Sequence, residues 1–123
     1  MTTTRVASTR AVITNYFDAK NRRDVEAMLQ AFASSATVRD ENNEYAGDLR
    51  IRHWLEHITN AHHLAFEVVE TTPTDRGAVA IVRASGDVPG SPFIVRYAFT
   101  LSGNTIGRLE IDLVADATQR SLA

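Results

Sequence analysis

The chain has 123 residues, a net charge of −2 at pH 7 and no cysteine, and 44% of its residues are hydrophobic. This composition is that of one folded domain, and it excludes disulfides, thiolate metal sites and cysteine nucleophiles. The charge gives no reason to expect nucleic acid or an anionic membrane as partner, and no apolar run approaches the roughly 18–20 residues of a membrane span. Because the first residues also lack the apolar core of a secretion signal, we expect a cytoplasmic protein that binds a small organic molecule or another protein.

Hydrophobic periodicity in the first half of the chain predicts three helices. The first runs from about residue 5 to residue 20. Asp24 is a suitable N-cap for a second helix, which should close at residues 34–35, and Asp48 can cap a third that extends to about residue 61. The first half is therefore expected to be mainly helical, with one exception.

That exception is a strand-like segment, Ala36–Asp40, which ends in a lone carboxylate and is followed by a polar loop to Gly47. A strand that stops at an aspartate presents that side chain at the mouth of the space that the sheet encloses. Asp40 is therefore the first candidate functional residue.

From Leu64 onward the hydrophobic period changes to two, which is typical of β-strands. Strands are expected over 64–70, 78–85, 93–101 and 106–114, followed by a polar tail over 115–123. One face of the last two strands is strongly apolar and carries Phe93, Val95, Tyr97, Phe99, Leu101, Leu109, Ile111 and Leu113. Three helices followed by hairpin-connected strands indicate a single α+β domain, residues 1–123 with its core in 5–114, in which helices cover a curved antiparallel sheet. Such a bent sheet encloses a cavity suited to a small molecule.

Arg83 is a charged residue on an otherwise apolar strand face. The alternation of the strand groups it with Val79 and Ile81 on the expected core face. A guanidinium buried there needs a partner, because burying it alone is very costly. Asp40 is one candidate partner, and a carboxylate or phosphate of a ligand is another. Alternatively, Arg83 lies near the end of the sheet and extends to water.

The order of these elements, together with several residues, resembles the nuclear transport factor 2-like superfamily, in particular its polyketide cyclase and ketosteroid isomerase branches. The residues that carry the resemblance are Tyr16-Phe17, Asp24, Phe32-Ala33, Ala36–Asp40, Gly47, Ile51-Arg52, Trp54 and the turn Ser102–Ile106. It covers about residues 8–114 and implies a cone-shaped α+β barrel that forms a homodimer through the outer sheet face. It implies a fold more specifically than a function, because this fold hosts enzymes, binding modules and transport adaptors alike.

The isomerase branch implies roles for four residues of this sequence. Its catalytic base matches Asp40, its oxyanion-stabilising tyrosine matches Tyr16, and an aromatic of its third helix matches Trp54. Its second oxyanion donor, a protonated aspartate, falls on Tyr97, where this sequence departs from the branch. A phenol also donates a hydrogen bond, so the donor pair is altered at this position rather than removed.

Three functions remain open from the sequence. The first is a cofactor-independent isomerase or cyclase in which Asp40 takes a proton next to a carbonyl and Tyr16 and Tyr97 donate to the enolate oxygen. The expected cavity wall consists of Trp54, Phe66, Ile81, Phe99, Ile111 and Leu113. The second is a non-catalytic module whose Arg83 binds a small acidic ligand, and the third is a protein-interaction domain whose cavity is filled by side chains. A plainer interpretation also stands, in which Asp40 caps the following loop and Tyr16 is a core aromatic.

His53, Glu56 and His57 have the spacing of an inverted zinc-protease motif. The third helix places both imidazoles opposite Trp54, where they should face solvent. We therefore expect no metal and no cofactor, and a small hydrophobic or acidic organic molecule as the ligand.

Overall fold

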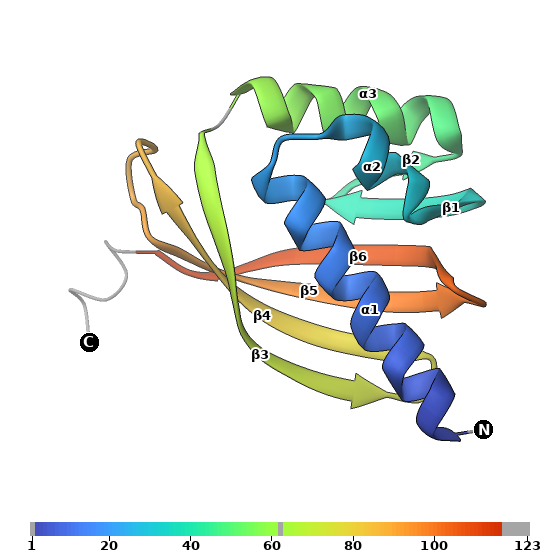
Figure 1. Cartoon of the computed structure of the whole chain (residues 1–123). Coiled ribbons are helices and arrows are strands. Elements are labelled where there is room, and N and C mark those ends of the chain that lie inside the picture. The colour runs from blue at the N-terminus through green and yellow to red at the C-terminus, as the bar shows by residue number, and fades with distance from the viewer. Residues whose placement is uncertain (1, 62, 117–123) are drawn as a thin grey trace.

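The computed structural model describes residues 2–61 and 63–116 and shows helices packed on the concave face of one curled sheet (Figure 1). Residues 117–123 of the predicted polar tail lie outside the described residues. The elements in chain order are α1 (Thr2–Asn21), α2 (Val25–Gln30), β1 (Phe32–Asp40), β2 (Asn43–Ala46), α3 (Asp48–Ala61), β3 (Leu64–Thr74), β4 (Gly77–Gly86), β5 (Phe93–Ser102) and β6 (Thr105–Ala115). No helix of the described part of the chain is both long and apolar enough to cross a membrane.

The sheet has six strands in the order β2-β1-β6-β5-β4-β3. Only β1 and β6 pair in parallel, and the remaining neighbours are antiparallel. Helix α1 crosses the concave face of the curled strands, while α2 and α3 lie over the edge formed by β1 and β2 (Figure 1). The predicted α+β fold with a curved, mainly antiparallel sheet is thus confirmed.

Two predicted boundaries in the first half are wrong. Helix α2 ends at Gln30 instead of residues 34–35, because Phe32 already pairs with Ile106 of β6 and begins β1. The loop predicted after Asp40 is instead a tight hairpin to β2, in which Asp40 pairs with Asn43. Both turn residues have positive φ angles, 53° and 67°, as a two-residue type I′ turn requires. Asp40 is therefore the last strand residue before a hairpin and not the start of a loose loop.

The predicted inner and outer faces of β4 are reversed. Strand β5 presents Val95 and Tyr97 to the interior, and their partners in β4 are Val82 and Ala80. Directly paired residues of neighbouring strands point to the same side, so the alanine-rich face of β4 is the buried one. Arg83 and Ile81 consequently lie on the outer face. Arg83 is exposed there, and Glu67 of β3 is the residue opposite it in the strand register. The physical reason is that small side chains fit beneath large aromatics, which alternation by residue size does not reveal.

An aromatic cluster forms where the second half of α1 meets the sheet. The ring of Tyr16 makes edge-to-face contacts with Phe17, Phe32 and Phe99, at centroid distances of 5.2, 5.8 and 5.9 Å. Such contacts add modestly to the large area that each ring buries. This aromatic cluster fills one end of the cone.

Candidate functional site

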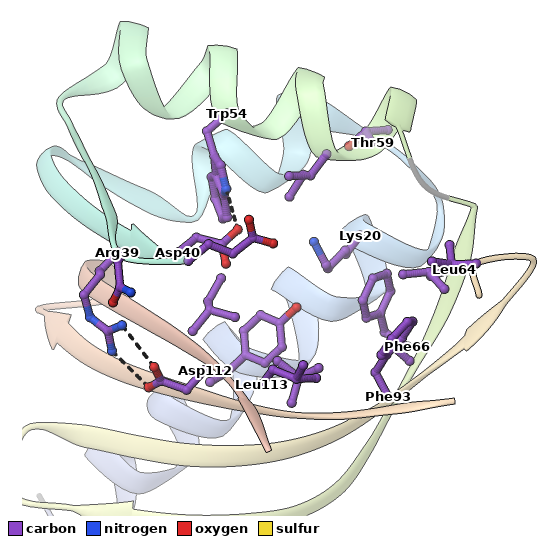
Figure 2. Close-up of a pocket in the computed structure, with 18 of the residues that line it drawn as sticks. Lys20, Arg39, Asp40, Trp54, Thr59, Leu64, Phe66, Phe93, Asp112 and Leu113 are labelled. Carbon is purple, nitrogen blue, oxygen red and sulfur yellow. Dashed lines mark hydrogen bonds and ion pairs between the residues drawn. The ribbon is translucent and has the colours of Figure 1, made fainter. Parts of the chain in front are cut away.

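The other end of the cone holds a cavity of about 480 Å³ that opens to solvent. Its wall is mainly apolar and comes from α1, α3 and the ends of several strands (Figure 2). The apolar wall residues are Trp54, Ile58, Leu64, Phe66, Ala84, Val88, Phe93, Val95, Ile111 and Leu113, and Tyr97 lines it as well. A cavity of this size and polarity suits a small organic molecule.

Asp40 stands in this cavity in a fixed orientation. The indole Nε1 of Trp54 donates a hydrogen bond of 3.0 Å to its Oδ2 atom (Figure 2). The indole ring is itself held by stacking on Tyr45, at a centroid distance of 6.0 Å and an interplanar angle of 28°. Because only one carboxylate oxygen is engaged by Trp54, Asp40 can accept a proton from a bound molecule.

The two tyrosines predicted from the sequence lie in different surroundings. Tyr97 lines the cavity, and burial, followed by the nearby Asp40 charge, raises the pKa of its hydroxyl. Tyr16 is fully buried in the aromatic cluster and is not part of the cavity wall, and its hydroxyl has no hydrogen-bond partner among the described residues. Burial raises the pKa of Tyr16 well above its usual value, and the charges of Tyr97 and Asp40 add to the rise. Tyr16 was expected to donate into the cavity, and it is not among the residues that line it.

Lys20 lies in the cavity opposite Asp40, and the sequence reasoning missed it. It is the one buried charged side chain among the described residues, with 8% of its surface exposed. Its Nζ lies over the ring of Phe66, 4.7 Å from the centroid, and 5.8 Å from that of Tyr16. Burial lowers the pKa of Lys20 to about 8, although the Asp40 carboxylate opposes this effect.

Asn21 explains why Lys20 is held in this position. Its side-chain amide donates to the Phe66 carbonyl at 2.8 Å and accepts from the Phe66 amide at 2.7 Å. These two bonds fix the end of α1 against β3 at the residue directly after Lys20. The lysine side chain is thereby directed into the space between Phe66 and Asp40 (Figure 2).

Three other charged groups at the cavity are already engaged by protein groups. Arg39 donates two hydrogen bonds to Asp112, at 3.0 and 2.9 Å, where β1 and β6 run side by side (Figure 2). This pairing raises the pKa of Arg39 and lowers that of Asp112. Arg23 donates to the Thr59 carbonyl and so links α1 to α3. Asp40, Lys20 and Glu41 are the remaining charged residues of the cavity wall that a ligand would meet.

Four of the six residues expected in the cavity wall line this cavity. Trp54, Phe66, Ile111 and Leu113 line the cavity, whereas Phe99 belongs to the aromatic cluster and Ile81 to the outer sheet face. Arg83 is on that outer face too, so it is not placed to bind a ligand in the cavity. His53 and His57 are exposed on α3, as expected.

A signal for Lys20 was present in the sequence. Lys20 is the only lysine of the chain, since the other twelve basic residues are arginines. It also continues the buried stripe of α1, three residues after Phe17 and four after Tyr16. A charged residue on the apolar face of a helix indicates a polar cavity or a buried partner.

Comparisons with known proteins agree with this geometry. The family model of the SnoaL-like domain matches residues 13–106. A presumed polyketide cyclase from Sinorhizobium meliloti is 33% identical, with a TM-score of 0.79 over 83% of this chain and 94% of that one. No protein with a curated description matches.

Two more distant structures share the fold. The epoxide hydrolase/cyclase-like enzyme SalBIII, which has a role in pyran ring formation in the polyether salinomycin, is 18% identical, with a TM-score of 0.70 over 86% of this chain and 90% of that one. A protein from Catenulispora acidiphila with a ketosteroid isomerase-like fold, solved with trimethylamine, is 16% identical, with a TM-score of 0.71 over 82% and 83% of the two chains.

Proposed function

The chain belongs to the SnoaL-like domain family, and we propose that it is a cofactor-independent enzyme that removes a proton from a carbon next to a carbonyl group. The substrate is a mostly apolar molecule bound in the cavity, Asp40 is the general base, and Tyr97 donates to the developing oxyanion. The observation that carries the proposal is the position of Asp40, a carboxylate held by one indole hydrogen bond within a largely apolar cavity.

The position of Asp40 is suited to proton abstraction for two reasons. The largely apolar wall lowers the local dielectric constant, which strengthens the electrostatic interactions between the carboxylate and a bound substrate. The bond from Trp54 orients the carboxylate before the substrate arrives, so less reorganisation is needed during the reaction.

Tyr97 supports the proposal as a hydrogen-bond donor. Because burial raises the pKa of its hydroxyl, the phenol keeps its proton at neutral pH and can donate to an enolate oxygen. Tyr16 does not reach the cavity, so in this proposal it supports the ring of Phe99 and does not touch the substrate.

The relatives support the same class of chemistry. The Sinorhizobium protein is described as a polyketide cyclase, and SalBIII as an epoxide hydrolase/cyclase-like enzyme with a role in pyran ring formation. We propose that this chain likewise rearranges or cyclises an organic substrate, without a metal or an organic cofactor.

The other functions open from the sequence receive less support. An acidic ligand held by Arg83 would require that residue to face the cavity, and it lies on the outer face. A protein-interaction domain with a filled interior does not match a cavity of about 480 Å³.

We further propose that the outer sheet face pairs with a second copy, because half-buried Ile94 and Ala98 lie there between charged residues.

Proton exchange tests the proposed function directly. Unsaturated ketones and 1,3-dicarbonyl compounds are incubated with the protein in deuterated buffer, and deuterium at the carbon next to the carbonyl is measured by NMR. Wild type should accelerate exchange of at least one compound, and Asp40→Asn should lower that rate by about 10²–10⁴-fold, the usual contribution of a general base. Asp75→Asn, in the exposed turn between β3 and β4, is the matched control and should exchange like wild type. Equal rates for wild type and Asp40→Asn on every compound that exchanges would refute the assignment.

A further inference from the structure

Lys20 is a buried amine for which the proposed function has no use. It is the only lysine of the chain, it lines the cavity, and it is the one buried charged side chain among the described residues. Of the three basic residues that line the cavity, Arg23 and Arg39 already donate to protein groups, and only the third, Lys20, is an amine. An arginine cannot lose its proton there, whereas a lysine can.

The surroundings of the amine shift its protonation equilibrium toward the neutral form. Two aromatic rings lie beside Nζ, and Lys20 forms no hydrogen bond or ion pair through its side chain with any described residue. The Asp40 carboxylate faces it across the cavity and favours the charged form, but Asp40 is bonded to Trp54 instead. With a pKa of about 8, about a quarter of Lys20 is neutral at pH 7.5, compared with about one part in a thousand for a lysine in water. A neutral amine in an apolar cavity is a nucleophile for carbonyl carbon.

We propose that Lys20 forms a Schiff base with an aldehyde or ketone group of the substrate. This proposal rests on the proposed function, since it specifies how the carbonyl group is activated before Asp40 removes the proton. The oxyanion to which Tyr97 donates then develops on the carbonyl oxygen while Lys20 adds, and not on an enolate. Lys20 and Asp40 point toward one another from α1 and β1, so a molecule attached to one lies next to the other (Figure 2).

The reaction balances without an oxidant or a reductant. The amine adds to the carbonyl carbon, and the oxygen takes a proton to give a carbinolamine. Loss of its hydroxyl group as water, with uptake of one proton, gives the protonated Schiff base. Asp40 then takes a proton from the adjacent carbon, the C–H electron pair forms a C=C bond, and the C=N pair moves to nitrogen to give an enamine. Reprotonation at carbon and addition of water release the product and the free amine.

Labelling with acetylacetone tests the reactivity of the amine. This 1,3-diketone condenses with a neutral amine to an enaminone, with loss of one water, and the product is detected by its near-ultraviolet absorbance and by intact mass. Since the chain has a single lysine, the N-terminal amine is the only other site, and Lys20→Met and Lys20→Arg report its contribution. We expect wild type to be labelled at Lys20 at least about tenfold faster than N-acetyl-lysine at pH 7.5, with a pH midpoint near 8. Labelling no faster than N-acetyl-lysine, or confined to the N-terminus, would overturn the proposal.

Deuterium exchange separates this proposal from the proposed function. If Lys20 acts covalently, Lys20→Arg should lose the exchange activity although it keeps the positive charge. If Lys20→Arg exchanges like wild type while Asp40→Asn does not, the Schiff base is refuted and the proposed function stands. If Lys20 is labelled rapidly and both Lys20→Arg and Asp40→Asn exchange like wild type, the Schiff base and the assigned base are both refuted. Wild-type labelling with peptide mapping needs no variant, so the first test holds even where a substitution prevents folding.

Discussion

The two ends of the conical interior are lined by the same strands and differ in what fills them. Along the inner face of β6, Leu109 is 0% exposed and Leu113 is 57% exposed. At the Leu109 end, Tyr16 and the other rings of the aromatic cluster occupy the space. At the Leu113 end, α1 has already ended at Asn21, and α3 contributes Trp54, Ile58 and Thr59 to the cavity wall. The difference teaches that the site is the part of the interior that the helices leave unfilled.

Truncating one leucine at each end should give the largest contrast in stability. Leu109→Ala is expected to lower the free energy of unfolding by about 3–4 kcal/mol, because it leaves a cavity in close-packed surroundings. Leu113→Ala, on the same face of the same strand, should lower it by less than about 1 kcal/mol, since that side chain is already in contact with solvent. Urea denaturation followed by circular dichroism measures both, and equal losses would contradict the division into a packed and an open end.

Lys20→Met should stabilise the folded protein, because it removes a charge at the open end of the interior that burial keeps away from water. The difference between the usual pKa of 10.5 and the value of about 8 in the folded chain corresponds to about 3 kcal/mol. Below pH 8 both the folded and the unfolded chain carry the proton, so wild type bears this penalty in full. Between pH 8 and 10.5 the unfolded chain binds more protons, so the stability of wild type should approach that of the variant as the pH rises.

The measurement for Lys20→Met is urea denaturation at several pH values from 6 to 10.5. The raised pKa values of Tyr16 and Tyr97 lower stability at the alkaline end, but they do so equally in both proteins, so the difference isolates Lys20. A pH-independent difference would show that Lys20 is not desolvated in the folded state.

Trp54→Phe should affect both proton exchange and stability. The expected loss of stability lies between those of Leu109→Ala and Leu113→Ala. It removes the donor to Asp40 and should lower the free energy of unfolding by about 1.5–2 kcal/mol, the usual range for a hydrogen bond to a charged group with some loss of packing. Proton exchange should fall as well, by about tenfold, because the carboxylate is no longer oriented. Tyr45→Phe keeps the stacked ring and serves as control, with expected changes of less than about 0.5 kcal/mol.

The two tyrosines should give the smallest and most specific contrast. Tyr16→Phe removes a buried hydroxyl without a partner among the described residues, so it should leave stability unchanged or raise it by about 1 kcal/mol, with exchange activity retained. Tyr97→Phe should instead slow proton exchange by about 10–10²-fold, because it removes the donor at the cavity wall. Slower exchange in Tyr16→Phe than in Tyr97→Phe would reverse this assignment.

Sequence patterns predicted the positions of the helices and strands better than they predicted which face of a strand is buried. The third helix and the last four strands were predicted nearly at their observed positions, since their hydrophobic periods are long and regular. The residues from Phe32 to Ser35 were misassigned, because a short apolar run fits a helix end and a strand start equally well. The faces of β4 were reversed, because Val79 and Ile81 are larger than the alanines that are in fact buried.

The candidate site was predicted in part. Asp40, Tyr97 and four wall positions, Trp54 among them, were named from the alternation of the strands and from a family resemblance. Lys20 was overlooked, since a basic residue at the end of a helix has an ordinary explanation in the helix dipole. Tyr16 was placed in the cavity because its separation from Asp40 along the chain says nothing about how much of α1 is buried beneath other rings.

The sequence alone determined the α+β class, the order of the helices and of every strand except β2, and the carboxylate at the end of β1, because these depend on short-range periodicity and on single residues. The tertiary structure decided which rings fill the interior, which face of β4 is buried and that the sole lysine meets Asp40 across a cavity. The physical reason is that packing and desolvation depend on distances between residues far apart in the chain, and those distances exist only once the sheet has curled around α1.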